Sequence, residues 1–253
     1  MAQLPSLILV HGAATGAWVW DAWRRHLGAF GWEVNVLDLR GHGRSLPIDL
    51  GTVTMEDYLG DLESVTAQIE TARGSHPIVG GWSMGGMLAL MYAAKHQETP
   101  ALLLFSPSPP LEIAGKASMD VLRKNPELVL EPPAFGVYPE DTDASRRALF
   151  DLTNDELAGF LSQSAGAQES GLAYRQRLRG ISIPAAAVHC PALVIYGARE
   201  TGITLEQNRA LAQHLGGEAL CVEGAGHWGI VYSHSLVSDT ARRVDAWLHN
   251  TLD

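Results

Sequence analysis

Short runs of almost entirely apolar residues recur along the chain, separated by longer segments in which apolar residues return every three or four positions. The runs are Ser6–Val10, Glu33–Leu39, Pro77–Gly80, Ala101–Phe105, Ala192–Tyr196 and Glu218–Val222. Strands that are covered on both faces lose the alternation of apolar and polar residues, because both sets of side chains are buried. The runs therefore predict buried, parallel strands.

The segments between the runs read as helices. The clearest begins at Thr54, where Asp57 completes an approximate capping box and apolar residues then follow at helical spacing. Further helices are predicted over Met84–Lys95, Thr204–Leu215 and Val237–Leu248. This alternation of strands and helices predicts an α/β fold with a doubly wound, mainly parallel sheet of about six strands. The carboxyl ends of such strands share one edge, where ligands bind.

One long segment lacks a convincing strand. It starts at Pro107, ends near His189, and is bounded by the proline-rich stretches 106–110 and 182–184. Its helical patterns include a capping box formed by Thr153 and Glu156. We therefore expect a core made of residues 1–106 and 190–253, with residues 107–189 forming an all-helical cap over the ligand-binding edge.

Composition narrows the class of protein. The chain has 253 residues, 46% of them hydrophobic and 18% charged, as in an ordinary globular domain with an insertion. A net charge of −10 argues against nucleic acid or an anionic membrane as a partner. The two cysteines have no metal-type spacing, and the N-terminus lacks the basic region of a signal peptide. We expect a cytoplasmic protein without a membrane span.

The stretch "VGGWSMGG" (79–86) carries the first candidate for chemistry. Residues 81–85 match the pattern G-x-S-x-G, and the central Ser83 falls where a predicted strand turns directly into a predicted helix. A serine on such an elbow is exposed and strained, and glycines two positions away on each side prevent clashes. A chain with 26 glycines also yields such a match by chance, so a glycine-rich turn without chemistry is the alternative.

Two backbone amides are candidates for an oxyanion hole. The Met84 N–H begins the helix after the serine, where the helix dipole favours negative charge. The Ala13 N–H follows the first strand in "LILVHGAATG", a position that an ordinary strand-to-helix turn also explains. We interpret His11 in the same loop as structural.

His227 is the candidate base among the ten histidines of the chain. It lies in the glycine-rich loop "VEGAGHWG" after the last strand, at the same edge as Ser83, and imidazole suits proton transfer near neutral pH. Four other histidines fall in or at predicted helices: His26, His96, His214 and His249. The loop of His42, "DLRGHGRS", suits backbone ordering better than proton transfer.

A carboxylate should hold the second nitrogen of the imidazole. Glu200 follows the strand Ala192–Tyr196 in "GARETGIT" and is the preferred candidate. Glu223, which lies close to His227 in the chain, stays open as an alternative.

These segments together resemble the α/β-hydrolase family, in its single-domain, esterase-like branch with a helical cap. The resemblance rests on "LVHG", "DLRGHGRS", "GWSMGG", "PALVIYGARE" and "GAGHWG", in that order along nearly the whole chain. It implies a triad of Ser83, Glu200 and His227 with an oxyanion hole from Ala13 and Met84. Two features depart from the family pattern: a glutamate stands where aspartate is usual, and the N-terminal hairpin of many members is expected to be missing.

The resemblance implies hydrolysis of a small, apolar carboxylic ester through an acyl-serine, without a metal or organic cofactor. Alternatives on the same triad are a carbon–carbon hydrolase, a lyase or a cofactor-free oxygenase, and a non-catalytic binding protein is a further one. Trp82 and Trp228 are candidate pocket walls or core residues. Five aromatic residues of the insertion face either the ligand or the interior of the cap: Phe135, Tyr138, Phe150, Phe160 and Tyr174. The bond cleaved, the acyl length and the oligomeric state stay open.

Overall fold

A six-stranded sheet forms the centre of the computed structural model, which describes residues 4–114, 134–136, 151–200 and 202–252. Its strand order is β2-β1-β3-β4-β7-β8, and every neighbouring pair is parallel. The strands are β1 (Leu7–Val10), β2 (Val34–Leu37), β3 (Ile78–Trp82), β4 (Leu102–Phe105), β7 (Ala192–Gly197) and β8 (Glu218–Val222). Each coincides with one of the apolar runs, which confirms the predicted doubly wound fold.

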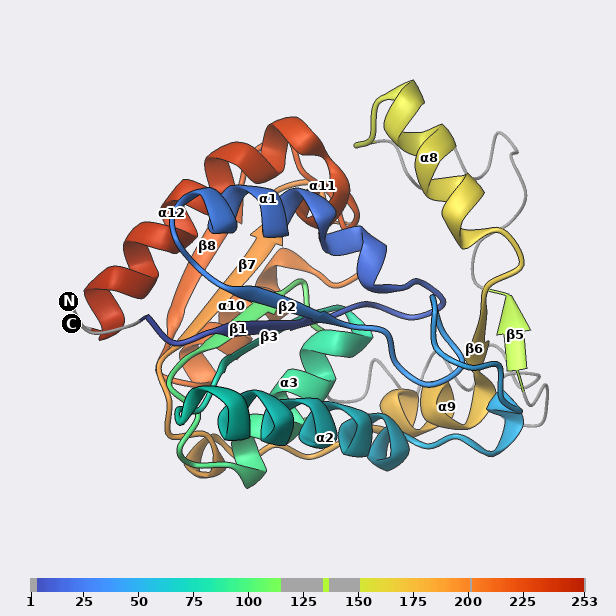
Figure 1. Ribbon diagram of the computed structural model, residues 1–253, viewed down its shortest axis with the longest axis horizontal. Coiled ribbons are helices and arrows are strands. Elements are labelled where there is room, and N and C mark those ends of the chain that lie inside the picture. Colours follow the sequence, from blue (N-terminus) through green and yellow to red (C-terminus); the bar gives the residue numbers. More distant parts are fainter. Residues whose placement is uncertain (1–3, 115–133, 137–150, 201, 253) are drawn as a thin grey trace.

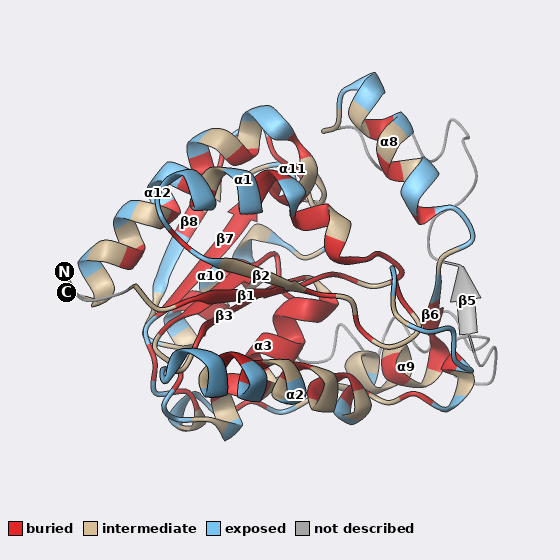
Figure 2. Ribbon diagram, viewed as in Figure 1, coloured by how far each residue is buried: buried red, intermediate tan, exposed pale blue. Residues whose placement is uncertain are grey.

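Helices cover both faces of this sheet (Figure 1). One face carries α2 (Met55–Arg73), α3 (Met84–Lys95) and α10 (Leu205–His214). The other carries α1 (Asp21–Ala29), α11 (Gly229–Tyr232) and α12 (His234–Leu252). Each side packs its own apolar cluster against the sheet, so the central strands are buried along their length (Figure 2). Within the described part of the chain, no helix combines the length and the apolar character needed to cross a bilayer.

Local sequence signals explain where several helices begin and end. Thr54 and Asp57 form the predicted capping box at the start of α2, and Gly74 ends that helix with a φ of 70°. Thr204 and Gln207 cap α10 in the same way. The short 3-10 turns are η1 (Ala17–Trp20), η2 (Leu50–Thr52) and η3 (Ala185–Ala187).

The segment between β4 and β7 is not all-helical, contrary to expectation. It contains α4 (Leu111–Ala114), α8 (Asn154–Ser164) and α9 (Gly171–Arg179), but also a two-stranded antiparallel sheet. This sheet pairs β5 (Ala134–Gly136) with β6 (Gln168–Ser170). Strands of three residues contain too few positions to show a periodicity, so no pattern of apolar residues predicts them. In Figure 1, α8, α9 and both short strands lie to one side of the six-stranded sheet.

Candidate active site

Ser83 occupies the sharp turn between β3 and α3. Its φ of 54° and ψ of −113° lie outside the regions that non-glycine residues favour. The flanking glycines are required by space: a Cβ on Gly81 would lie 2.1 Å from the carbonyl oxygen of Gly85, and one on Gly85 would lie 2.3 Å from that of Val10. The Ser83 N–H donates to the carbonyl of Phe105 at 3.0 Å, which fixes the turn to β4. This is the geometry of a nucleophile elbow.

His227 and Glu200 meet at the same edge of the sheet, although 27 positions separate them in the chain. The Nδ1 atom of His227 lies 2.9 Å from Oε2 of Glu200, whose side chain is fully buried. Burial opposes ionisation of Glu200, but its attraction to His227, the hydrogen bond between them and the nearby Ser106 hydroxyl lower its pKa to about 2. Glu200 is therefore an ionised carboxylate that holds the imidazole by one nitrogen. The alternative acid, Glu223, is exposed.

The loop of Glu200 adapts to the longer side chain. Its second oxygen, Oε1, accepts hydrogen bonds from the backbone N–H groups of Gly202 at 3.0 Å and Ile203 at 3.4 Å. One carboxylate oxygen is thus fixed by the loop while the other reaches His227. The additional methylene of glutamate does not prevent this contact.

Trp82 connects the serine elbow to the histidine loop. It directly precedes Ser83, and its Nε1–H donates to the carbonyl of His227 at 2.9 Å. Its ring lies 5.2 Å from the imidazole, centroid to centroid, and it is only 1% exposed. Trp228 is half-buried and packs edge-on against His227 at 5.1 Å. Both tryptophans therefore contact the imidazole of His227. Trp82 also holds the backbone of His227 beside Ser83.

The two amides considered for the oxyanion hole lie on adjoining segments. Met84 is the first residue of α3, and Ala13 lies in the loop after β1. A Cβ on Gly85 would lie 2.5 Å from the carbonyl oxygen of His11, so this loop begins directly against the elbow. His11 in the same loop is fully buried: Nε2 accepts from the Leu39 N–H at 3.2 Å, and Nδ1 donates to the carbonyl of Gly12 at 2.7 Å. Burial lowers the pKa of His11 to about 4, so it is neutral and orders the loop.

Three charged residues of the insertion contact segments around the site, and no motif in the sequence predicts any of them. Asp151 is the first: its Oδ2 accepts from the N–H groups of Gly226 at 2.6 Å and Gly229 at 2.5 Å. These glycines lie on either side of His227, so Asp151 fixes the histidine loop from outside the core.

Glu169, on β6, is the second and is fully buried. Its carboxylate accepts from the Tyr58 hydroxyl at 2.7 Å and from the Ala14 N–H at 3.1 Å, and lies 3.4 Å from Nε2 of His42. Burial opposes its ionisation, but the contact with His42 lowers its pKa to about 2. Glu169 thus joins the insertion to the loop that contains Ala13. The third residue, Arg177, lies on α9 and is paired with Ser108.

Two of the five aromatic side chains expected in the cap lie in the described part of the chain, and each packs against different neighbours. Phe160 is fully buried and packs edge-on against Trp18 and Tyr232, with centroids 5.1 and 5.4 Å away. Tyr174 is half-buried beneath the guanidinium of Arg177. Tyr138, Phe150 and the side chain of Phe135 lie outside the described residues.

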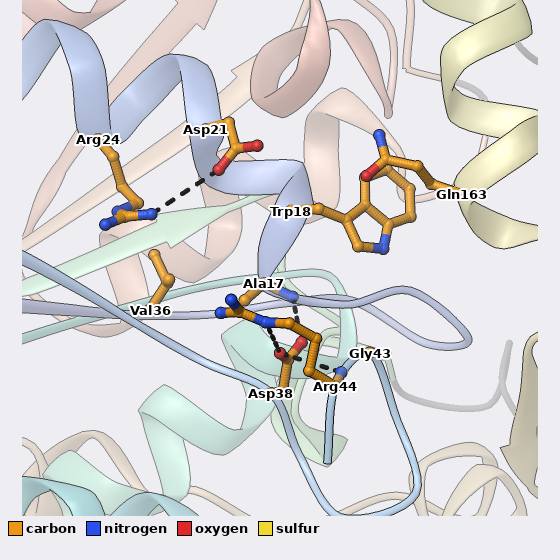
Figure 3. A pocket seen from close by; sticks show the side chains of 9 residues that line it. All are labelled: Ala17, Trp18, Asp21, Arg24, Val36, Asp38, Gly43, Arg44 and Gln163. Carbon is orange, nitrogen blue, oxygen red and sulfur yellow. Dashed lines mark hydrogen bonds and ion pairs between the residues drawn. The ribbon is translucent and has the colours of Figure 1, made fainter.

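A cavity of about 370 Å³ opens between η1, the loop after β2 and α8 (Figure 3). Its charged walls are already paired with each other. Asp38 accepts from the Ala17 N–H at 2.6 Å and faces Arg44, and Arg24 faces Asp21. No residue of the candidate triad lines this cavity.

Comparison of the sequence with known protein families identifies the family of this chain. A sequence profile of the alpha/beta hydrolase family matches residues 7–239. The chain belongs to the alpha/beta hydrolase family. This confirms the resemblance drawn from the five motifs.

Individual relatives of this alpha/beta hydrolase are more distant. A pimeloyl-acyl-carrier protein methyl ester esterase from Salmonella heidelberg is 35% identical over 104 residues, which are 41% of this chain and 37% of that protein. The match thus spans well under half of the curated relative. A thermophilic esterase from Thermogutta terrifontis has a TM-score of 0.71 at 22% identity, covering 98% of this chain and 91% of that one. A methylesterase from Arabidopsis has a TM-score of 0.70 at 17% identity, covering 96% and 100%. The two structures share the fold.

Proposed function

We propose that this alpha/beta hydrolase cleaves a small carboxylic ester through an acyl intermediate on Ser83. The observation that carries the proposal is the hydrogen bond between Glu200 and His227, at 2.9 Å, beside a strained serine elbow. A carboxylate that holds one nitrogen of an imidazole leaves the other nitrogen free to take a proton from a serine and return it. The relatives include several esterases, which supports an ester as the substrate.

In this mechanism Nε2 of His227 removes the hydroxyl proton of Ser83 as its oxygen attacks the ester carbonyl. The resulting oxyanion accepts hydrogen bonds from the N–H groups of Ala13 and Met84. The carbon–oxygen bond to the alcohol then breaks, and the alcohol leaves with the proton from His227. Water attacks the acyl-serine with the same base, releasing the acid and restoring Ser83. The ionised Glu200 stabilises the imidazolium in both halves of the reaction.

The proposal also assigns roles around the triad. Trp82 and Trp228 border the imidazole, and residues 107–189 act as a cap over the ester. A panel of 4-nitrophenyl esters with acyl chains of increasing length measures how much space the cap leaves. A steep fall in kcat/KM beyond short chains indicates a shallow pocket.

The replacement Ser83→Ala tests the acyl-serine directly. We expect it to abolish both ester turnover and labelling by a fluorophosphonate probe, since no other group then accepts the acyl or phosphonyl group. The matched control is Ser6→Ala, because Ser6 is a buried serine that precedes β1 at the opposite edge of the sheet. The control should keep both activities. An unlabelled wild-type protein without turnover favours a binding function, and labelling that survives Ser83→Ala contradicts the proposed nucleophile.

A further inference from the structure

The guanidinium of Arg177 lies two hydrogen bonds away from the backbone of Ser83. Its Nη1 donates to the hydroxyl of Ser108 at 3.1 Å, and the Ser108 N–H donates to the carbonyl of Ser83 at 2.8 Å. Arg177 belongs to α9 in the insertion, whereas Ser108 follows β4 in the core. The side chain therefore reaches the candidate nucleophile from the side of the insertion.

Two further donors of this guanidinium have no acceptor among the described residues. The Nε and Nη2 atoms of Arg177 are buried, and no hydrogen-bond acceptor reaches either one from the described residues. Glu169, the carboxylate that acts on Arg177 most strongly, already accepts from Tyr58, Ser170 and Ala14. A buried guanidinium with unsatisfied donors lowers stability. Such a group in a native structure marks strain, a catalytic role or a bound species that supplies the acceptor.

Arg177 shares its carboxylate neighbour, Glu169, with His42. Arg177 is a permanent cation, and the contact with Glu169 raises the pKa of His42 against the effect of its burial, which favours the imidazolium. Glu169 is the single carboxylate that acts on Arg177 in the described part of the chain, whereas His42 also faces Asp38. Burial keeps Tyr58 in its neutral form by raising the phenol pKa. Tyr174 contributes its ring face at 5.3 Å. The charge of Glu169 is thus shared between His42 and Arg177.

We propose that Arg177 binds a carboxylate at the far end of the ester substrate, so that the preferred substrate is the monoester of a short dicarboxylic acid. The inference rests on the proposed ester hydrolysis and names the class of acyl group. Nε–H and one Nη2–H of a guanidinium point in parallel from one edge and match the two oxygens of a carboxylate. Nε and Nη2 are buried in this structure, so this edge meets an entering carboxylate after a rotation of the terminal torsions of Arg177.

The test compares two esters that differ only at this end. Methyl butyrate and monomethyl succinate have the same length, but succinate has a carboxylate where butyrate has a methyl group. Initial rates are measured by proton release, and the ratio of kcat/KM for the charged ester to that for the neutral ester is the readout. Monomethyl glutarate and adipate extend the series to find the spacing that fits best.

For Arg177→Met we expect this ratio to fall about 10- to 100-fold, because the bidentate charged contact is lost. Arg177→Lys keeps the charge without the fork and should give an intermediate ratio. The matched control is Arg179→Met, which removes the same charge from an exposed position on the same helix and should leave the ratio unchanged. Thermal unfolding checks that all three variants are folded.

Each other outcome has a distinct meaning. If Arg177→Met lowers both rates equally, or if the wild type does not favour the charged ester, the carboxylate proposal is wrong while ester hydrolysis stands. Persistence of both activities in Ser83→Ala instead contradicts the proposed function itself. If Arg177→Met fails to fold, the ratio for Arg177→Lys decides: a ratio equal to that of the wild type overturns the inference.

Discussion

At the scale of single residues, Glu200 shows how a departure from a family pattern is accommodated. The longer side chain reaches Nδ1 of His227 at 2.9 Å because its other oxygen is anchored by the N–H groups of Gly202 and Ile203. The loop is therefore built around the length of glutamate. Aspartate at this position would withdraw the carboxylate by one carbon–carbon bond, roughly 1.5 Å.

Replacing Glu200 tests this fit. Glu200→Asp should lower kcat about 100-fold with little change in KM, because a displacement of about 1 Å in a catalytic group has an effect of this size. Glu200→Gln should lower kcat about 10³- to 10⁴-fold, because an amide neither selects the required imidazole tautomer nor stabilises the imidazolium. Glu223→Gln is the control and should behave as the wild type, since Glu223 is exposed. A larger loss for Glu223→Gln than for Glu200→Gln would exchange the two assignments.

At the scale of elements, the strands were predictable and the contacts of the insertion were not. Strands such as β4 and β7 are buried on both faces, so unbroken apolar runs reveal them in the sequence. Parallel strands end at one shared edge of the sheet, which predicts that Ser83, Glu200 and His227 lie at that edge. Glu169 has no such signal, because its partners Ala14 and Tyr58 lie 155 and 111 positions away.

The strand-to-helix elbow of β3 and α3 depends on a close backbone approach that only glycine permits. Gly81→Ala should lower the free energy of unfolding by about 3 kcal/mol or more, because its Cβ would lie 2.1 Å from a backbone oxygen that cannot move freely. Gly60→Ala in α2 is the matched control: its Cβ meets open space, and alanine should raise stability by about 0.5–1 kcal/mol. Urea denaturation measures both. Equal stability of the two variants would show that the elbow tolerates a side chain.

At the scale of the whole molecule, buried carboxylates link stability to pH. Glu169 joins the insertion to the core, Glu200 orients His227, and the pKa of each is held at about 2 against an ordinary value of 4.5. A carboxyl group whose pKa is lower in the folded state stabilises that state above its unfolded pKa. This contribution is lost as the pH falls from about 4.5 to about 2. His42 acts in the opposite direction: its raised pKa stabilises the fold at low pH, and this contribution is lost as the pH rises through the folded value.

The variant Glu169→Gln should therefore change both the level and the pH dependence of stability. At neutral pH we expect the free energy of unfolding to fall by about 3 kcal/mol, because His42 loses its buried partner and the Tyr58 hydroxyl faces an uncharged amide. Between pH 4.5 and 2 the slope of this free energy with pH should decrease by up to about 1.4 kcal/mol per pH unit, since one fewer proton is taken up on unfolding. Glu206→Gln, at an exposed position, serves as the control and should leave the level unchanged. Urea denaturation at a series of pH values gives both quantities. If Glu169→Gln and the wild type lose stability in parallel below pH 4.5, Glu169 is not a group that ties the insertion to the core through its charge.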